Sequence, residues 1–208
     1  MRAVVPPIEA ESYRILRAQV DTSALPPLTR AVTERVIHAS ADLDYLADLV
    51  CAEPDLATGR AALLAGTAVV TDVAMVAAGI TRRDLVGPVV CRVADPDAAR
   101  LAVEAGITRS AAAVRLAAEQ VGPGAVWVVG CAPTALFELI ALDVAPALVV
   151  GLPVGFVGAA ESKAALRESG LPAVSNLSAK GGSAVAAAAL NALLYVDPDV
   201  RPEPEESP

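Results

Sequence analysis

The sequence AVWVVGCAPTALFELIAL, residues 125–142, decides the fold class. An apolar run from Ala125 to Val129 is followed by a glycine and then by a segment with helical spacing from Pro133 to Leu142. A second apolar run, Ala147 to Val150, comes next. The order strand, helix, strand indicates two parallel strands, because parallel neighbours need a long crossover connection that is usually helical.

The same alternation extends along most of the chain. Apolar runs predict strands at Thr67 to Thr71, Pro88 to Val93, Ala125 to Val129, Ala147 to Val150 and Pro172 to Asn176. Helical spacing predicts helices at Ala98 to Ala105, Thr108 to Gln120, Pro133 to Leu142, Gly158 to Glu168 and Gly182 to Leu194. Continuous β-branched runs between helices are typical of a parallel sheet covered on both faces. We therefore predict a single doubly wound α/β domain with a mostly parallel sheet of about five strands.

The two ends of the chain differ from this pattern. The N-terminal part predicts only helices, at Ser12 to Gln19, Leu28 to Ala39, Leu43 to Val50 and Leu56 to Ala65. The last twelve residues, 197–208, are mainly acidic residues and proline and lack the apolar side chains that an ordered segment would bury. We expect the α/β domain with its helical N-terminal region over residues 1–196 and a disordered acidic tail over 197–208.

Composition excludes several classes of protein. A formal net charge of −8 argues against a general nucleic-acid surface, which needs a basic stripe. No apolar stretch reaches the roughly 18 to 20 residues of a membrane span, and two prolines and two glutamates stand where a signal peptide would be apolar. A cytoplasmic location is expected. Three cysteines without CxxC spacing indicate neither a disulfide framework nor a zinc site.

The loops after the strands are where a doubly wound sheet binds its ligands. Gly130 ends one run, and the helix from Pro133 through Thr134 is expected to begin with free N–H groups that can bind an anion. Glycine-rich turns also precede Gly158 and the pair Gly182 and Ser183. For any one of these turns taken alone, an ordinary connection between strand and helix is the favoured interpretation. Because neither GxGxxG nor a phosphate-binding P-loop is present, a nucleotide-dependent enzyme rests on fold analogy only.

The single histidine, His38, lies in ERVIHASAD near the end of a predicted helix. On spacing alone it is either a half-buried residue of a helix end or a proton donor, since histidine titrates near neutral pH. One histidine without a GxSxG motif supports no nucleophilic triad, and without a second ligand it supports no metal site.

Six motifs, in this order and spacing, resemble the precorrin-8X methylmutase family from about Ser12 to Leu194. They are ERVIHASAD (34–42), TDVAMVAAGITR (71–82), GITRSAAA (106–113), GCAPTALFELI (130–140), GLPVGFVGAAESK (151–163) and KGGSAVAAAALNALL (180–194). The resemblance implies a homodimeric isomerase of cobalamin biosynthesis without a cofactor. Its substrate would be precorrin-8X or cobalt-precorrin-8, whose methyl group moves from carbon 11 to carbon 12 to give hydrogenobyrinate or cobyrinate.

The family resemblance also implies site residues. His38 matches the family's active histidine and is expected to be the acid catalyst. Ser12, Thr81 and Arg109 match substrate-contacting positions, and Lys163 is a further expected contact. The remaining expected substrate-binding residues are those of the glycine-rich loops: Gly130, Thr134, Gly158, Gly182 and Ser183. The apolar helix at Ala184 to Leu194 adds to the expectation of a homodimer, since it has more apolar surface than one sheet layer covers.

The sequence departs from the family pattern at three places. Cys131 and Ile107 stand where asparagine is usual, and Ser178-Ala179 replaces a Gly-Arg pair. Losing polar side chains removes hydrogen bonds to a ligand, so a noncatalytic corrinoid-binding or product-carrying protein of the same fold is the alternative. Neither precorrin-8X nor cobalt-precorrin-8 requires a metal ligand from the protein, so the sequence does not distinguish between these two substrates.

Overall fold

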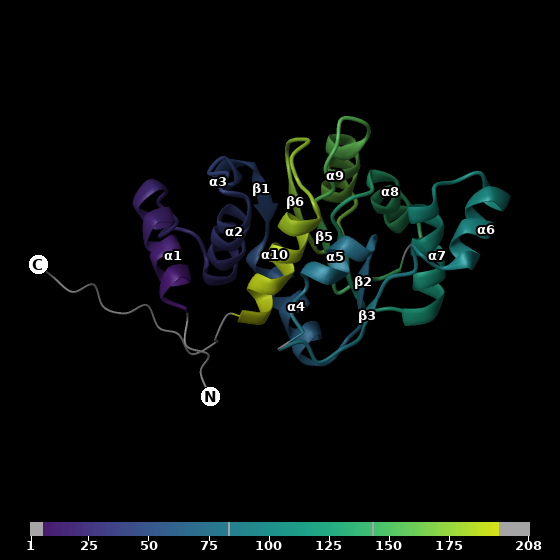
Figure 1. The fold of residues 1–208 in the computed structure, drawn as a ribbon, viewed down its shortest axis with the longest axis horizontal. Helices are drawn as coiled ribbons and strands as arrows, with labels where there is room; N and C mark the ends of the chain where they lie inside the picture. Colours follow the sequence, from purple (N-terminus) through teal and green to yellow (C-terminus); the bar gives the residue numbers. More distant parts are fainter. Residues whose placement is uncertain (1–5, 83, 143, 196–208) are drawn as a thin grey trace, which may run out of the picture.

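The computed structural model describes residues 6–82, 84–142 and 144–195 (Figure 1). One sheet contains six strands in the order β1-β6-β5-β4-β2-β3. Strands β2 to β6 are parallel, and β1 is antiparallel to β6. The predicted mostly parallel sheet is confirmed, with one strand more than expected. The strands are β1 (Leu49–Cys51), β2 (Val69–Thr71), β3 (Val89–Val90), β4 (Val126–Val129), β5 (Leu148–Gly151) and β6 (Ala173–Asn176).

Helices precede the sheet and connect its strands. The N-terminal part holds α1 (Pro7–Gln19), α2 (Pro27–Ser40), α3 (Tyr45–Asp48) and α4 (Glu53–Leu64). The remaining helices are α5 (Ala74–Gly79), α6 (Pro96–Ala105), α7 (Arg109–Val121), α8 (Pro133–Ala141), α9 (Ala159–Glu168) and α10 (Ser183–Tyr195). The five helices predicted after residue 96 are confirmed. The tail predicted at 197–208 lies outside the described residues.

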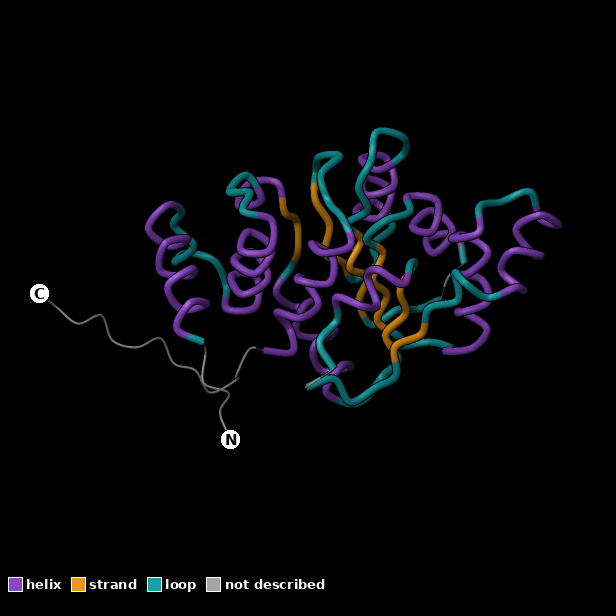
Figure 2. The backbone as a smooth tube through the Cα atoms, viewed as in Figure 1, coloured by secondary structure: helices purple, strands orange, loops and turns teal. Residues whose placement is uncertain are grey.

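Alternation along the strands creates two separate cores. Val126 and Val128 of β4 face one layer, and Trp127 and Val129 face the other, because successive side chains of a strand point to opposite faces. The first layer contains α2, α4, α5 and α10, and the second contains α7, α8 and α9. Figure 2 shows the strands between these helices. Every residue of β4 is buried, which explains the unbroken apolar run in the sequence.

Two elements differ from the sequence prediction. The helix predicted at Leu43 to Val50 is wrong: only Tyr45–Asp48 is helical, and Leu49–Cys51 is strand β1. Leu49 pairs with Asn176 and Cys51 with Val174, so the strand is stabilised by residues more than a hundred positions away. Helix α5 was not predicted, because its six residues are too few to show a helical period.

The switch point of the sheet lies between β2 and β4. Strand β2 has β3 on one side and β4 on the other, so the direction of the crossovers reverses between them. Loops that leave neighbouring strands at such a point diverge and form the usual ligand crevice of an α/β sheet. Here these loops carry Asp72 after β2 and Gly130 after β4.

Helix α10 is covered within its own chain. Its residues from Val185 to Leu194 are all buried, and it packs mainly on α2 and α5. The apolar surface that one sheet layer does not cover is thus buried mainly by α2 and α5 of the same chain. None of the helices among the described residues is long and apolar enough to cross a bilayer.

Candidate active site

His38 lies in the last turn of α2 and is held by two residues of α1. The Ser12 hydroxyl lies 2.9 Å from the Nδ1 atom of His38. The ring of Tyr13 stacks on the imidazole with centroids 5.0 Å apart and planes inclined by 10°. In the described part of the chain Nδ1 is thus engaged, and Nε2 is the ring nitrogen left for a ligand.

A cavity of about 320 Å³ opens beside His38. Its walls come from the end of α2, the end of α5 and one side of α10. Alanines from α10 supply apolar surface, and three polar or charged side chains, from Arg35, His38 and Asn191, share the lining with them. The lining residues are Arg35, His38, Ala39, Gly79, Ala184, Ala187, Ala188 and Asn191. The alanines suit an apolar ring face, and the polar side chains beside them suit polar groups at the edge of such a ring.

Thr81 is held next to this cavity by Asn191. The Asn191 side chain accepts from the Thr81 backbone N–H at 2.9 Å and donates to the Gly79 carbonyl at 2.9 Å. Both bonds fix the turn after α5 against α10. Ser12, His38 and Thr81, which the sequence places far apart, therefore belong to one region of the fold.

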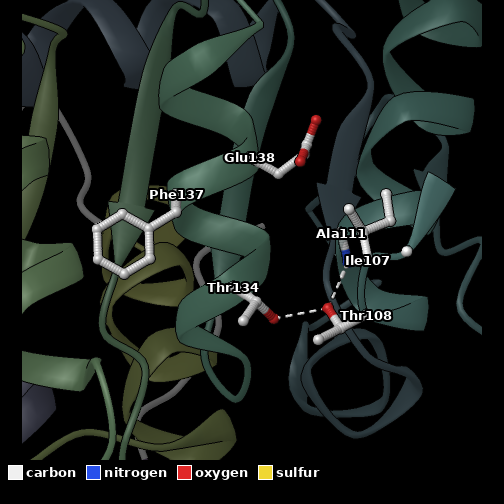
Figure 3. A pocket seen from close by; sticks show the side chains of 7 residues that line it. Ile107, Thr108, Ala111, Thr134, Phe137 and Glu138 are labelled. Carbon is white, nitrogen blue, oxygen red and sulfur yellow. Dashed lines mark hydrogen bonds between the residues drawn. The ribbon is translucent and has the colours of Figure 1, made fainter. Parts of the chain in front are cut away.

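Thr134 lines a second depression, of about 370 Å³, between α7 and α8, and Arg109 directly follows Thr108, another of its lining residues. Figure 3 shows Thr108 and Thr134 facing each other, with hydroxyls 2.7 Å apart, while Phe137 leaves α8 on another side. The Thr108 hydroxyl also caps α7 by accepting from the Ala111 N–H. Arg109 begins α7 and is exposed.

The anion expected at the start of α8 is a carboxylate of the protein itself. Asp72 is buried, and it accepts from the backbone N–H groups of Gly130, Cys131 and Ala132 at 3.1, 2.8 and 2.8 Å. Burial raises the pKa of Asp72, and these three bonds oppose that effect. The prediction of free N–H groups near Gly130 is wrong, because Asp72 occupies the position that a ligand anion would take.

Gly130 instead allows close packing. A Cβ atom at Gly130 would lie 2.9 Å from Ala186 and 3.0 Å from the Cα of Ser183. The start of α10 therefore packs so closely on the end of β4 that a side chain larger than glycine would not fit at position 130 without a shift. Ser183 is buried as the first residue of α10.

Gly158 and Gly182 directly precede helices α9 and α10. Gly158 adopts a positive φ of 76° at the N-cap of α9 and lies against Pro133 and Phe137 of α8. The Gly182 N–H donates to the Leu152 carbonyl at 2.9 Å, so the expectation of a free N–H there is also wrong. Both loops are fixed by contacts within the chain.

Lys163 is fully buried behind the loop that leads into α10. Its ammonium donates to Asn176 Oδ1 at 2.8 Å and to the Lys180 carbonyl at 2.6 Å. Burial lowers the pKa of Lys163 to about 8. The structure places this side chain in the interior of the domain, where it holds the loop after β6.

The three departures from the family pattern have different surroundings. The Ser178 hydroxyl donates to Asp48 at 2.7 Å and so takes part in the network that holds the loop after β6. Ile107 lines the depression next to Thr108. The Cys131 side chain is exposed, while its N–H is bound by Asp72.

Three residues near His38 belong to the candidate site but were not predicted from the sequence. Tyr13 adjoins Ser12, and Arg35 precedes His38 by one helical turn and lines the same cavity. Asn191 is an amide inside the alanine and leucine run of α10, where a buried polar side chain needs specific partners. An isolated amide in an apolar helix could have indicated the contact with Thr81.

The arrangement supports proton transfer. An imidazole that lines a cavity and has one nitrogen bound by a hydroxyl can lend or take a proton through its other nitrogen. Across residues 6–82, 84–142 and 144–195, no three His, Cys, Asp or Glu side chains are grouped as a metal site requires.

Comparison with known proteins assigns the chain to a family. A family model described as Precorrin-8X methylmutase matches residues 7–196. The cobalt-precorrin-8 methylmutase of Salmonella typhimurium is 44% identical over 196 residues, which cover 90% of this chain and 93% of the relative. The precorrin-8X methylmutase of Pseudomonas aeruginosa is 44% identical over 194 residues, covering 89% of this chain and 93% of that relative. The crystal structure of precorrin-8X methyl mutase from Thermus thermophilus superimposes with a TM-score of 0.81 at 37% identity, covering 90% of this chain and 93% of that one. The chain described above therefore belongs to the precorrin-8X methylmutase family.

Proposed function

We propose that the protein moves a methyl group from carbon 11 to carbon 12 of precorrin-8X or cobalt-precorrin-8 in cobalamin biosynthesis. Family membership supports this reaction. The observation that carries it is His38, which is bonded to Ser12 and lines a cavity with both apolar and polar walls. We also propose a cytoplasmic location, which rests on the sequence alone.

The chemistry needs little more than a shaped cavity and one acid. Migration breaks the bond between carbon 11 and the methyl group and forms the bond to carbon 12, so substrate and product are isomers. A proton from Nε2 of His38 can withdraw electron density from the macrocycle during migration. Because no proton is gained overall, it returns to His38 before the next turnover. Binding that favours the rearranging geometry supplies the rest of the acceleration.

The direct test is to add the purified protein to precorrin-8X and to cobalt-precorrin-8 and record visible spectra. We expect the spectrum of the conjugated product to appear at a catalytic protein concentration. A substrate spectrum that shifts only in proportion to bound protein, without conversion, would instead support the corrinoid-binding or product-carrying alternative.

We propose that the substrate-binding residues come from two subunits. His38 lines one cavity, and Ser12 and Thr81 are bonded to its lining residues His38 and Asn191. Thr134 lines the other depression, which shares no lining residue with the first, and Arg109 follows its lining residue Thr108. Helices α2 and α7, which carry these two groups, lie toward opposite ends of the molecule in Figure 1. In a twofold homodimer, α7 of the partner subunit can approach α2. If a residue of α2 contacts a residue of the partner's α7, the symmetry repeats the same contact with the subunits exchanged.

The homodimer can be tested by sedimentation. We expect a particle of twice the chain mass of 21.0 kDa at micromolar concentration. The exposed Phe156 and Val157, in the loop after β5, are the side chains that we expect to be covered, because such apolar groups rarely stay in water together. The variant Phe156→Ser should shift the equilibrium toward monomer, whereas Val103→Ser, at another largely exposed apolar site, on α6, should not. A wild-type protein that sediments only as a monomer would contradict the proposal.

We expect Arg109 to contact a carboxylate of the substrate. The variant Arg109→Ala should weaken ligand binding by one to two powers of ten, roughly 1.5 to 3 kcal/mol for a charge-assisted contact, with a smaller effect on the rate of the bound state. Titration of the corrinoid absorbance measures the affinity. Arg100→Ala is the matched control, because Arg100 is exposed on α6 and pairs with Asp97. Equal affinities for wild type and Arg109→Ala would remove Arg109 from the proposed site.

A further inference from the structure

Helix α1 contacts the rest of the protein through one polar stripe. The residues of this stripe recur at helical spacing. Four of them contact residues of α2 through hydrogen bonds, ion pairs or ring stacking, and the fifth, Leu16, is buried in the apolar core. Two isoleucines of the same helix, Ile8 and Ile15, are exposed by 82% and 45%. Apolar burial therefore contributes little to holding α1 in place. The stripe consists of Glu9, Ser12, Tyr13, Leu16 and Arg17.

Glu34 of α2 is the centre of the polar contacts. Its side chain is 4% exposed, and its carboxylate accepts from the Arg17 guanidinium at 2.7 to 3.2 Å. The Thr22 hydroxyl donates to it at 2.6 Å and Arg30 at 3.1 Å. One carboxylate thus joins α1, the segment between the helices and α2. Burial raises the pKa of Glu34. Its bonds to Arg17, Thr22 and Arg30 together lower the pKa by more than burial raises it, so the pKa lies below the ordinary value.

The same pair of helix faces holds His38. Glu34 precedes His38 by four residues, which is one turn of α2. Arg17 follows Tyr13 by four residues, which is one turn of α1. The bond between Arg17 and Glu34 and the contacts of Ser12 and Tyr13 with His38 are therefore adjacent links between the same two helices.

We propose that Glu34 is a positioning residue of the methylmutase: by fixing α1 on α2 through Arg17, it keeps the Ser12 hydroxyl on Nδ1 of His38 and leaves Nε2 for the substrate. The inference rests on the proposed function, because it assumes that His38 is the acid. In this proposal α1 determines, through Ser12, which ring nitrogen of His38 is available to the substrate. The matching pair on the outer side of α1, Glu11 with Arg14, is exposed and links α1 only to itself.

The sole histidine of the chain makes this testable by nuclear magnetic resonance. Protein labelled with ¹⁵N and purified without a histidine tag gives one pair of imidazole nitrogen signals. If the Ser12 hydroxyl donates to Nδ1, as a proton donor at Nε2 requires, the neutral imidazole of wild type is the Nε2–H tautomer and its two signals are well separated. Glu34→Gln and Arg17→Gln should bring the two signals closer together, because loss of the Ser12 bond lets both tautomers form. Ser12→Ala should do the same, and Glu11→Gln should keep the wild-type signals.

Turnover provides the second measurement. We expect Glu34→Gln and Arg17→Gln to lower kcat on the order of tenfold with KM changed less than about twofold, since a displacement of about 1 Å can cost up to a hundredfold. Arg17→Lys, which keeps the charge, should restore part of the rate. Glu11→Gln should turn over as wild type does. Arg17 is half-exposed, so Arg17→Gln decides the question even if Glu34→Gln does not fold.

The outcomes separate the two proposals. If folded Glu34→Gln or Arg17→Gln keeps the wild-type imidazole signals, the positioning role of Glu34 is overturned, whatever the activity. If the signals change as expected but wild type converts no substrate, the positioning role stands and the proposed function fails. A stability difference between wild type and Glu34→Gln should be fully present above pH 4.5 and shrink as the pH falls through the lower native pKa, because only the ionised carboxylate binds Arg17 strongly.

Discussion

Replacing His38 by alanine should lower kcat by about 10² to 10⁴, the usual contribution of a positioned general acid. The Ser12 hydroxyl and the ring of Tyr13, which hold the imidazole, carry no group that donates a proton readily at neutral pH. Single-turnover conversion of precorrin-8X, followed by its visible spectrum, measures the bound-state rate directly.

The fold of His38→Ala should survive, because His38 is only half-buried and lies in the last turn of α2. Loss of the stacked pair with Tyr13 should reduce the free energy of unfolding by about 1 kcal/mol. Product affinity should remain near that of wild type, since the proposed carboxylate contacts are elsewhere. Turnover within a factor of about three of wild type would show that His38 is a structural residue of the helix end.

Local sequence patterns predicted the fold where each element is formed by its own residues. The run Ala125 to Val129 becomes β4 because both of its faces are buried, and the segment from Pro133 becomes α8 because proline fits the first helical turn. Strand β1 was missed because Leu49–Cys51 is defined by its pairing with Val174 to Asn176. No local period can reveal such a distant partner.

The candidate site was predictable only in part for a similar reason. Motifs resembling the family identified His38, and the structure adds that Ser12 is its direct neighbour. The start of α8 was expected to bind an anion, and an anion is bound there, but it is Asp72 from a loop 58 residues earlier in the chain than Gly130. Lys163 was expected at the ligand, whereas its ammonium binds Asn176 inside the domain. In both cases the residue type indicated the chemistry, and only the fold shows which partner satisfies it.

Asp72 is the residue whose loss should most destabilise the switch point. The variant Asp72→Ala removes the acceptors of three backbone N–H groups, at Gly130, Cys131 and Ala132. The bond to the Gly130 N–H is buried, and the bonds to the Cys131 and Ala132 N–H groups are partly buried. An unsatisfied buried donor costs about 1 to 3 kcal/mol, so we expect the free energy of unfolding to fall by about 3 to 5 kcal/mol.

Urea unfolding monitored by circular dichroism measures this loss, and two further variants determine its cause. Asp72→Asn keeps one acceptor oxygen but turns an amide donor toward the backbone N–H groups, so it should lose an intermediate amount of stability. Asp97→Asn is the control: Asp97 is exposed and pairs with Arg100 on the surface of α6, so its change should stay within about 0.5 kcal/mol. Hydrogen exchange at Gly130, Cys131 and Ala132 should accelerate in Asp72→Ala more than at the buried centre of β4. A stability loss below about 1 kcal/mol, with exchange at these three amides unchanged, would mean that other groups or water satisfy the start of α8, and Asp72 would then not be the anion that fixes the switch point.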